Sequence, residues 1–232
     1  MKLGTATAAA DGTFSFISTM PSAPYTTVGI PTPFNMTLIA RGNTSRAVAY
    51  NSFFVRVNII PTPGSGKIGQ KIHLSGGGFV NGETVTISMS NTQVATATAD
   101  TNGAFRTTFV VPPDAQPGNY FCNLCAVGST SGQSANVSFI VLPSMTITPQ
   151  QGPSGTTITV SGNGYFPYDT VWIYWFDPNT NTQTQLTSVN TNGNSFQTTI
   201  TAPSNLTTGT TYDIVVQDAD NEGTIQLPFL AT

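Results

Sequence analysis

Apolar and polar residues alternate with a period of two over much of the chain, most clearly at 35–38, 84–89 and 156–160. Successive side chains of an extended strand point to opposite faces, so this pattern predicts strands with one buried face. Turn-forming Asn-Gly pairs, as at 81–82 and 102–103, separate the segments at intervals of about 8–12 residues. No stretch keeps a helical periodicity. The sequence therefore predicts an all-β protein with essentially no helix.

The pattern also repeats along the chain. Three similar segments end in Phe14, Phe105 and Phe196, which lie 91 residues apart. A second motif occurs twice, as Ser-Gly-Gly-Gly-Phe at 75–79 and as Ser-Gly-Asn-Gly-Tyr at 161–165. About seven short strands in a repeat of this length are typical of an immunoglobulin-like sandwich. We therefore expect tandem immunoglobulin-like β-sandwiches.

The repeats predict three domains of unequal completeness. Residues 57–142 and 143–232 each carry the full set of motifs. Residues 1–56 carry only the C-terminal half of a repeat and lack the Ser-Gly-x-Gly-aromatic segment with the strands around it. The first repeat is therefore expected to be incomplete.

This half-domain is expected to form about four strands, including 13–20, 34–40 and 47–55. Alone it would expose an apolar face and unpaired strand edges, so a piece of this size is not expected to be stable by itself. Two arrangements remain open. In the first, the missing half precedes this segment in a longer array. In the second, another chain supplies it. We favour the first, because the last repeat ends with no spare strand that could be donated to another chain.

The order of the motifs resembles a known family. Ile-x-Pro is followed by Gly-x-x-Ile-x-Leu/Val-Ser-Gly-x-Gly-Phe/Tyr, Val-x-Ile, Asn-Gly-x-Phe, Gly-x-Tyr and a closing Phe strand. This order is similar to the tandem Ig-like repeats, of IPT/TIG or related type, of long bacterial and archaeal cell-surface proteins. The resemblance covers 57–232 fully and 1–56 in part. It implies an extracellular β-sandwich module but no reaction, because such modules serve as stalks, adhesins, filament subunits and accessory domains of enzymes.

Composition narrows the function further. Charged residues make up 7% of the chain, where about a quarter is usual, while Thr, Ser and Asn number 39, 19 and 18. Such a hydroxyl- and amide-rich surface suits an extracellular setting. The net charge of −3 argues against a nucleic-acid partner. The single histidine, His73, argues against a His-based triad or a His–Cys metal cluster, so we expect neither an enzyme nor a cofactor.

The few charges are unevenly divided. Residues 1–142 carry all seven basic and four acidic residues, a net charge of +3, while residues 143–232 carry six acidic and no basic ones, a net charge of −6. Ends of opposite sign would steer head-to-tail association. Chance in a chain with so few charges explains the division equally well.

The most unusual segment is the aromatic strand 171–176. Alignment with 85–90 assigns three of its residues to the core: Val171, Ile173 and Trp175. Three aromatic residues are then expected to point outward: Trp172, Tyr174 and Phe176. We favour a contact surface for another protein chain. A platform for sugar rings and a cover formed by a loop or domain of this chain are the alternatives.

Cys122 and Cys125 lie three residues apart on an expected strand. Residues at this spacing point to opposite faces, so a local disulfide needs a bulge. A disulfide in an oxidising compartment and two thiols both remain open. A metal or redox role is disfavoured, because no further ligand and no helix N-terminus lie nearby.

Four asparagines head Asn-x-Ser/Thr sequons and are candidate N-glycosylation sites: Asn35, Asn43, Asn136 and Asn205. Their number is what the composition gives by chance. Their expected places, on outward strand positions and in turns, are compatible with modification.

Together these features predict a non-enzymatic extracellular structural protein, a segment of a multi-Ig-like surface filament, sheath or stalk. The expected partners are other copies of the chain or other surface proteins, and glycans. The alternative is an adhesin or carbohydrate-binding module. No apolar run reaches the length of a membrane-spanning helix.

Overall fold

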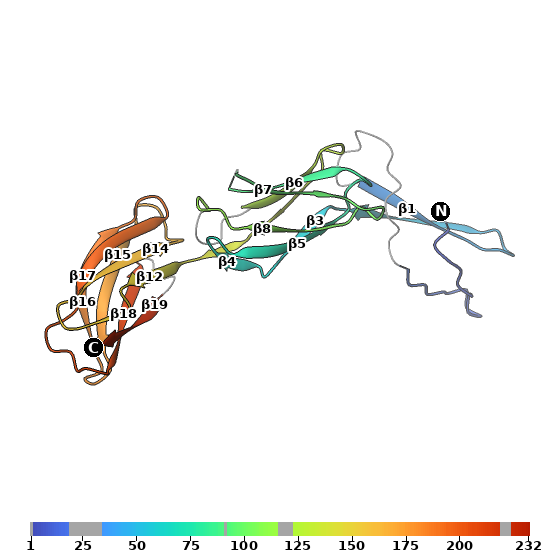
Figure 1. Ribbon diagram of the computed structural model, residues 1–232. Coiled ribbons are helices and arrows are strands. Elements are labelled where there is room, and N and C mark those ends of the chain that lie inside the picture. The colour runs from blue at the N-terminus through green and yellow to red at the C-terminus, as the bar shows by residue number, and fades with distance from the viewer. Residues whose placement is uncertain (1, 19–33, 91, 116–122, 219–223) are drawn as a thin grey trace.

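The computed structural model describes residues 2–18, 34–90, 92–115, 123–218 and 224–232. Within these residues all regular secondary structure is β-strand (Figure 1). The expected all-β class is confirmed. The strands form two sandwiches and one separate hairpin.

The middle sandwich is built from β3 to β11. Three strands form one layer, in the order β3 (Asn58–Thr62), β5 (Lys71–Gly77) and β8 (Phe105–Val110). Four strands form the other, in the order β10 (Ser134–Val137), β9 (Leu124–Gly128), β6 (Thr84–Met89) and β7 (Thr92–Thr98). These ladders are antiparallel, and one short parallel pair joins β4 (Ser65–Lys67) to β11 (Ile140–Leu142).

The C-terminal sandwich is built from β12 to β19 and repeats this plan. Its first layer has the order β12 (Ser144–Thr148), β14 (Thr157–Asn163) and β17 (Ser195–Thr201). Its second layer has the order β13 (Gln151–Gly152), β19 (Thr224–Ala231), β18 (Thr211–Asp218), β15 (Thr170–Asp177) and β16 (Thr182–Asn190).

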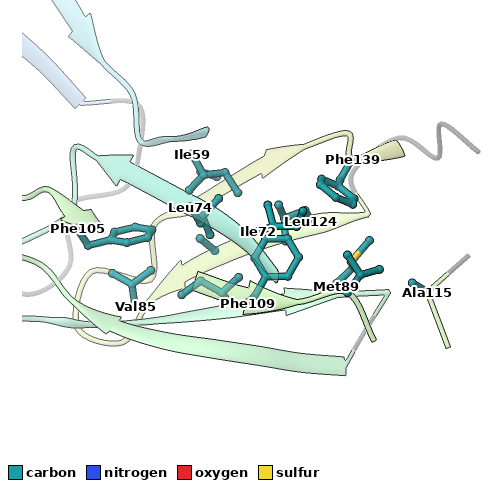
Figure 2. Packing of buried hydrophobic residues seen from close by; sticks show 14 of the residues in the cluster. Ile59, Ile72, Leu74, Val85, Met89, Phe105, Phe109, Ala115, Leu124 and Phe139 are labelled. Atoms are coloured by element: carbon teal, nitrogen blue, oxygen red, sulfur yellow. The ribbon is translucent and has the colours of Figure 1, made fainter. Parts of the chain in front are cut away.

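Each sandwich holds its own core between its two layers. On β6, the apolar positions Val85, Ile87 and Met89 are fully buried, and the alternating Thr86 and Ser88 are only partly covered. Figure 2 shows side chains of both layers of the middle sandwich pointing into the space between them. The two-residue period thus produces a buried and a partly open face on one strand.

The Ser-Gly-x-Gly-aromatic motif has a packing role. A Cβ atom on Gly76 would lie 2.3 Å from the ring of Phe105, so only glycine lets this ring lie against the strand. The ring of Phe79, three residues later, lies 5.5 Å from the same phenylalanine. Gly162 repeats this arrangement in the C-terminal sandwich, where a Cβ atom would lie 2.2 Å from the Phe196 ring.

The N-terminal part forms one antiparallel hairpin, β1 (Phe34–Arg41) with β2 (Val48–Val55). The prediction of a strand at 13–20 is wrong for residues 13–18, which form no strand. Residues 19 and 20 lie outside the described part. A strand forms only as part of a ladder, and none of the ladders of the described structure includes residues 13–17.

Candidate interaction surface

The aromatic strand β15 has two different faces. Val171, Ile173 and Trp175 are buried in the core, where the Trp175 ring lies 5.3 Å from that of Tyr212. The alternating aromatic residues are half-buried and lie outside the core cluster: Trp172, Tyr174 and Phe176. The strand is an inner strand of its layer, between β18 and the edge strand β16. The aromatic row therefore runs along the outer face of the C-terminal sandwich, one strand from its edge.

A buried valine lies beside this row. Val215 on β18 is directly opposite Tyr174 and is only 1% exposed, although it does not belong to the core cluster. Its chain neighbours Ile214 and Val216 are core residues, so Val215 points to the outer face. Directly opposite residues of an antiparallel pair have Cβ atoms about 4.5–5.5 Å apart. The outer face thus has a small apolar patch of its own.

Polar side chains border the row on both sides. The residues opposite the three aromatics on β16 are Ser188, Gln185 and Gln183. On β18, Gln217 lies opposite Trp172 and Asp213 lies opposite Phe176. An apolar centre with a rim of amides and a carboxylate is an arrangement found in protein contact surfaces and in ligand platforms.

The middle sandwich shows that the fold does not require these aromatics. β6 is the counterpart of β15, because it pairs with β7 and β9 in the same way and has its register shift at the same place, between Ile87 and Ser88. The register shift of β15 lies between Ile173 and Tyr174. Ser88 therefore stands where the C-terminal sandwich has Tyr174. The same sandwich forms with a hydroxyl at the position of an aromatic ring.

The register also refines the alignment of the repeats. Leu124 lies opposite Met89, and Ile214 lies opposite Trp175, so Ile214 is the structural counterpart of Leu124. Val216, two residues further along, lies opposite Ile173. Both positions face the core, so the predicted face of this strand is unchanged.

The two cysteines are only partly within the described structure. Cys122 lies outside it. Cys125 lies on β9, half-buried, opposite Ser88 on one side and Asn136 on the other. The local disulfide stays a prediction.

The sequons lie in three kinds of place. Asn136 is exposed on the edge strand β10, and Asn43 and Asn205 are exposed in loops. Asn35 lies on β1. An exposed side chain is accessible to a modifying enzyme, and glycosylation of these residues stays a prediction.

Groups suited to catalysis or metal binding are sparse in the described residues. They contain no cluster of three or more His, Cys, Asp or Glu side chains that could hold a metal ion. One open groove of about 520 Å³ runs between the edges of β7 and β8, and no titratable side chain lines it. No helix of the described part is long and apolar enough to cross a membrane.

A contact between the two sandwiches was not predictable from the sequence. The side-chain amide of Asn194 donates hydrogen bonds to the carbonyl oxygens of Pro113 at 2.7 Å and Ala115 at 3.1 Å. Asn194 lies in a turn of the C-terminal sandwich, and Ala115 belongs to the core of the middle one. An asparagine after Asn-Gly is typical of a turn, so the sequence carried no signal for a second role.

Comparison with known protein families gives a match over part of the chain. A model of the macroglobulin-like domain matches residues 54–141. This similarity supports an immunoglobulin-like fold for the middle sandwich. Among solved structures, the ectodomain of the teleost fish polymeric Ig receptor aligns with 12% identity, 76% coverage of this chain, 98% coverage of that chain and a TM-score of 0.30. No curated protein matches the chain significantly.

Proposed function

We propose that this chain is a non-enzymatic, extracellular structural segment of a multi-Ig-like surface filament, sheath or stalk, with repeats of the IPT/TIG or a related type. The outer face of β15 is its contact surface, and the partner is another copy of the chain or another surface protein. This proposal builds on the immunoglobulin-like fold, which by itself implies no reaction.

The aromatic row on β15 carries the proposal. Trp172, Tyr174 and Phe176 occupy outward positions, and at two of the equivalent places β6 has Thr86 and Ser88. Aromatic side chains bury about 150–250 Å² each and dominate the energetics of interfaces. They are enriched at interface centres, where charged residues are depleted. The middle sandwich forms without aromatic residues at these two places, so the aromatic row on β15 supports a role in contact rather than in folding.

The division of charge is compatible with such an assembly. All seven basic residues lie in 1–142, and residues 143–232 have six acidic residues and no basic ones. Opposite potentials at the two ends favour head-to-tail encounters and fix their register. This effect weakens as salt screens exposed charges, with a screening length of about 8 Å at physiological ionic strength.

A carbohydrate-binding module is the second candidate, supported by the rim of the same surface. Gln183, Gln185 and Gln217 offer amide donors and acceptors next to a flat aromatic row. Sugar rings stack on aromatic faces, while amides satisfy their hydroxyl groups. The two candidates therefore compete for one surface and differ in what covers it.

Replacement of Trp172 with Ser tests the proposal. We expect self-association of the chain, measured by sedimentation velocity over a concentration series, to weaken about tenfold, because central aromatic residues contribute most to interfaces. The matched control is Tyr168→Ser, since Tyr168 is 87% exposed and lies outside the row. The control is expected to associate like the wild type.

Two results would reject the surface filament. In one, Trp172→Ser and the wild type associate equally. In the other, the wild type stays monomeric and its tryptophan fluorescence changes on addition of polysaccharides, a response that Trp172→Ser abolishes. The second result would establish the carbohydrate-binding alternative.

A further inference from the structure

Residues 2–18 contain a turn that also occurs in the middle sandwich. In both, two backbone hydrogen bonds close the turn: Ala9 N to Thr13 O and Gly12 N to Ala9 O in one, Asp100 N to Ala104 O and Gly103 N to Asp100 O in the other. In both turns the next equivalent amide donates to an aspartate carboxylate, Thr13 N to Asp11 and Ala104 N to Asp100, although the two aspartates occupy different positions of the turn. The two turns are therefore the same structural element, and Phe14 is the counterpart of Phe105.

The surroundings of the two turns are opposite. Phe105 is 4% exposed, whereas Phe14 is 56% exposed. A Cβ atom on Gly103 would lie 2.2 Å from the carbonyl oxygen of Phe79, whereas one on Gly12 would meet nothing within 4 Å. The place taken in the middle sandwich by the Ser-Gly-x-Gly-aromatic segment is thus open beside residues 12–14.

Strand pairing also shows that the first half of a repeat is missing beside residues 2–18. In the middle sandwich β7 pairs with β6 and β8 pairs with β5, and each is the outermost strand of its layer. In the C-terminal sandwich β16 and β17 likewise pair with β15 and β14. All these partners come from the first half of a repeat. Residues 2–18 are the counterpart of β7 and β8, and they form no strand.

The hairpin β1–β2 is the part of the N-terminal half that needs no outside strand. Its counterparts β9–β10 and β18–β19 also pair with each other. In those sandwiches the other edge of β9 and β18 is paired with β6 and β15, an edge that β1 leaves unpaired in the described structure. Phe53 on β2 is 36% exposed, whereas Phe139 and Phe229 of the later repeats are fully buried.

We propose that residues 2–18 and the hairpin β1–β2 form an acceptor for the first half of an immunoglobulin-like repeat, a polypeptide segment with the pattern of residues 57–91. The segment places a glycine against Phe14, an aromatic ring three residues later beside it, and its last strand between residues 2–8 and β1. Residues 57–232 do not supply it, because their own first halves already pair within their own sandwiches. This inference is independent of the surface on β15.

The test adds the segment to the whole chain. A copy of residues 57–91 placed before Met1 restores the repeat spacing, because Phe14 and Phe105 lie 91 residues apart. Hydrogen–deuterium exchange is measured at 13–18 and 34–41, with 105–110 of the same molecule as internal reference. We expect exchange at both sites to slow at least tenfold in the extended chain.

Two variants serve as controls. A Gly76→Val change in the added copy places a side chain where the Phe14 ring would pack. It is expected to abolish the protection from hydrogen exchange. Phe14→Ala is expected to leave melting of the original chain unchanged, since the ring is exposed there, and to speed exchange at 13–18 in the extended chain.

The proposal is overturned if the added segment leaves exchange at 13–18 and 34–41 unchanged while 105–110 stays protected, and if a copy of 143–182 in its place also leaves exchange unchanged. It is also overturned if residues 2–18 of the original chain are as protected as 105–110. That result would mean that a second copy of the chain covers them.

Discussion

Tyr165 is the clearest case of a residue that is not optimal where it stands. Its hydroxyl is buried and has no hydrogen-bond partner in the described structure. Its counterpart in the middle sandwich is Phe79, which is fully buried without a hydroxyl. Both rings pack against the phenylalanine of their repeat, Tyr165 at 5.2 Å from Phe196.

Replacement of Tyr165 with Phe is therefore expected to stabilise the C-terminal sandwich. An unsatisfied buried hydroxyl costs about 1–3 kcal/mol, and the change removes it while keeping the ring. We expect a gain of about 1 kcal/mol in the free energy of unfolding, measured with urea. A loss of stability would show that the hydroxyl has a partner after all.

Burial of Tyr165 also makes the stability of the C-terminal sandwich depend on pH. Burial raises the pKa of the Tyr165 phenol above its ordinary value of 10.0, and the carboxylate of Asp218 adds to this effect. The unfolded chain loses the phenol proton near pH 10 while the folded chain keeps it, so this contribution to stability is full below pH 10 and falls above it. Urea midpoints at pH 9 and pH 11 should differ more in the wild type than in Tyr165→Phe. Equal differences would contradict the assignment.

At the scale of the element, one buried carboxylate organises the loop after β9. Glu83 is 4% exposed and accepts hydrogen bonds from the backbone amides of Val80 at 2.6 Å, Thr130 at 3.1 Å and Ser131 at 3.0 Å. The hydroxyl of Ser131 donates to it as well. The carboxylate thus fixes two chain segments that are 48 residues apart.

Truncation of Glu83 to Ala is expected to destabilise the middle sandwich by about 3 kcal/mol, because it leaves three amide donors without their acceptor. Urea unfolding measures the change. Glu83→Gln keeps one acceptor oxygen and should cost less. A cost below about 0.5 kcal/mol for Glu83→Ala, the range of ordinary surface changes, would mean that water replaces the carboxylate.

Strands were predictable from the sequence where a partner strand was present. The alternation in β6 and β15 identified the buried face of each, because one face of each strand meets the core. The same kind of pattern at 13–17 gave no strand, because a strand forms only within a ladder and none of the described ladders includes this segment. Burial of Glu83 was not predictable, because its amide donors at 130 and 131 are distant in sequence.

The candidate surface was partly predictable for a similar reason. Alternation and the comparison of repeats identified the three aromatic residues of the row. Burial of Val215 on the other face, next to Tyr174 and between two core residues, was not predictable from the sequence. A run of Ile-Val-Val is apolar on both faces, and only the register shows which side chain joins the row.

At the scale of the whole molecule, the junction of the two sandwiches is short. Only Pro143 separates β11 from β12, and Asn194 bridges the junction through Pro113 and Ala115. Figure 1 shows the two sandwiches following each other along the chain. A short linker and a bridging amide favour a fixed angle between neighbouring repeats, as a filament or stalk requires.

Replacement of Asn194 with Ala is expected to loosen this junction and to leave each sandwich folded. Small-angle X-ray scattering should show a broader distribution of interdomain distances. The free energy of unfolding of each sandwich should change by less than about 0.5 kcal/mol, as for a surface substitution. Asn179→Ala, in an exposed turn, is the matched control. An unchanged scattering profile for Asn194→Ala would show that the linker alone sets the angle.

Negative-stain electron microscopy of the material isolated from its native source is the decisive test of a structural role. We expect regular fibres, sheaths or stalks built from these sandwiches, and we expect the purified chain with Trp172→Ser to need about tenfold higher concentration to assemble in this way. Separate particles with no regular assembly, in native material and in the purified wild-type chain at high concentration, would contradict it.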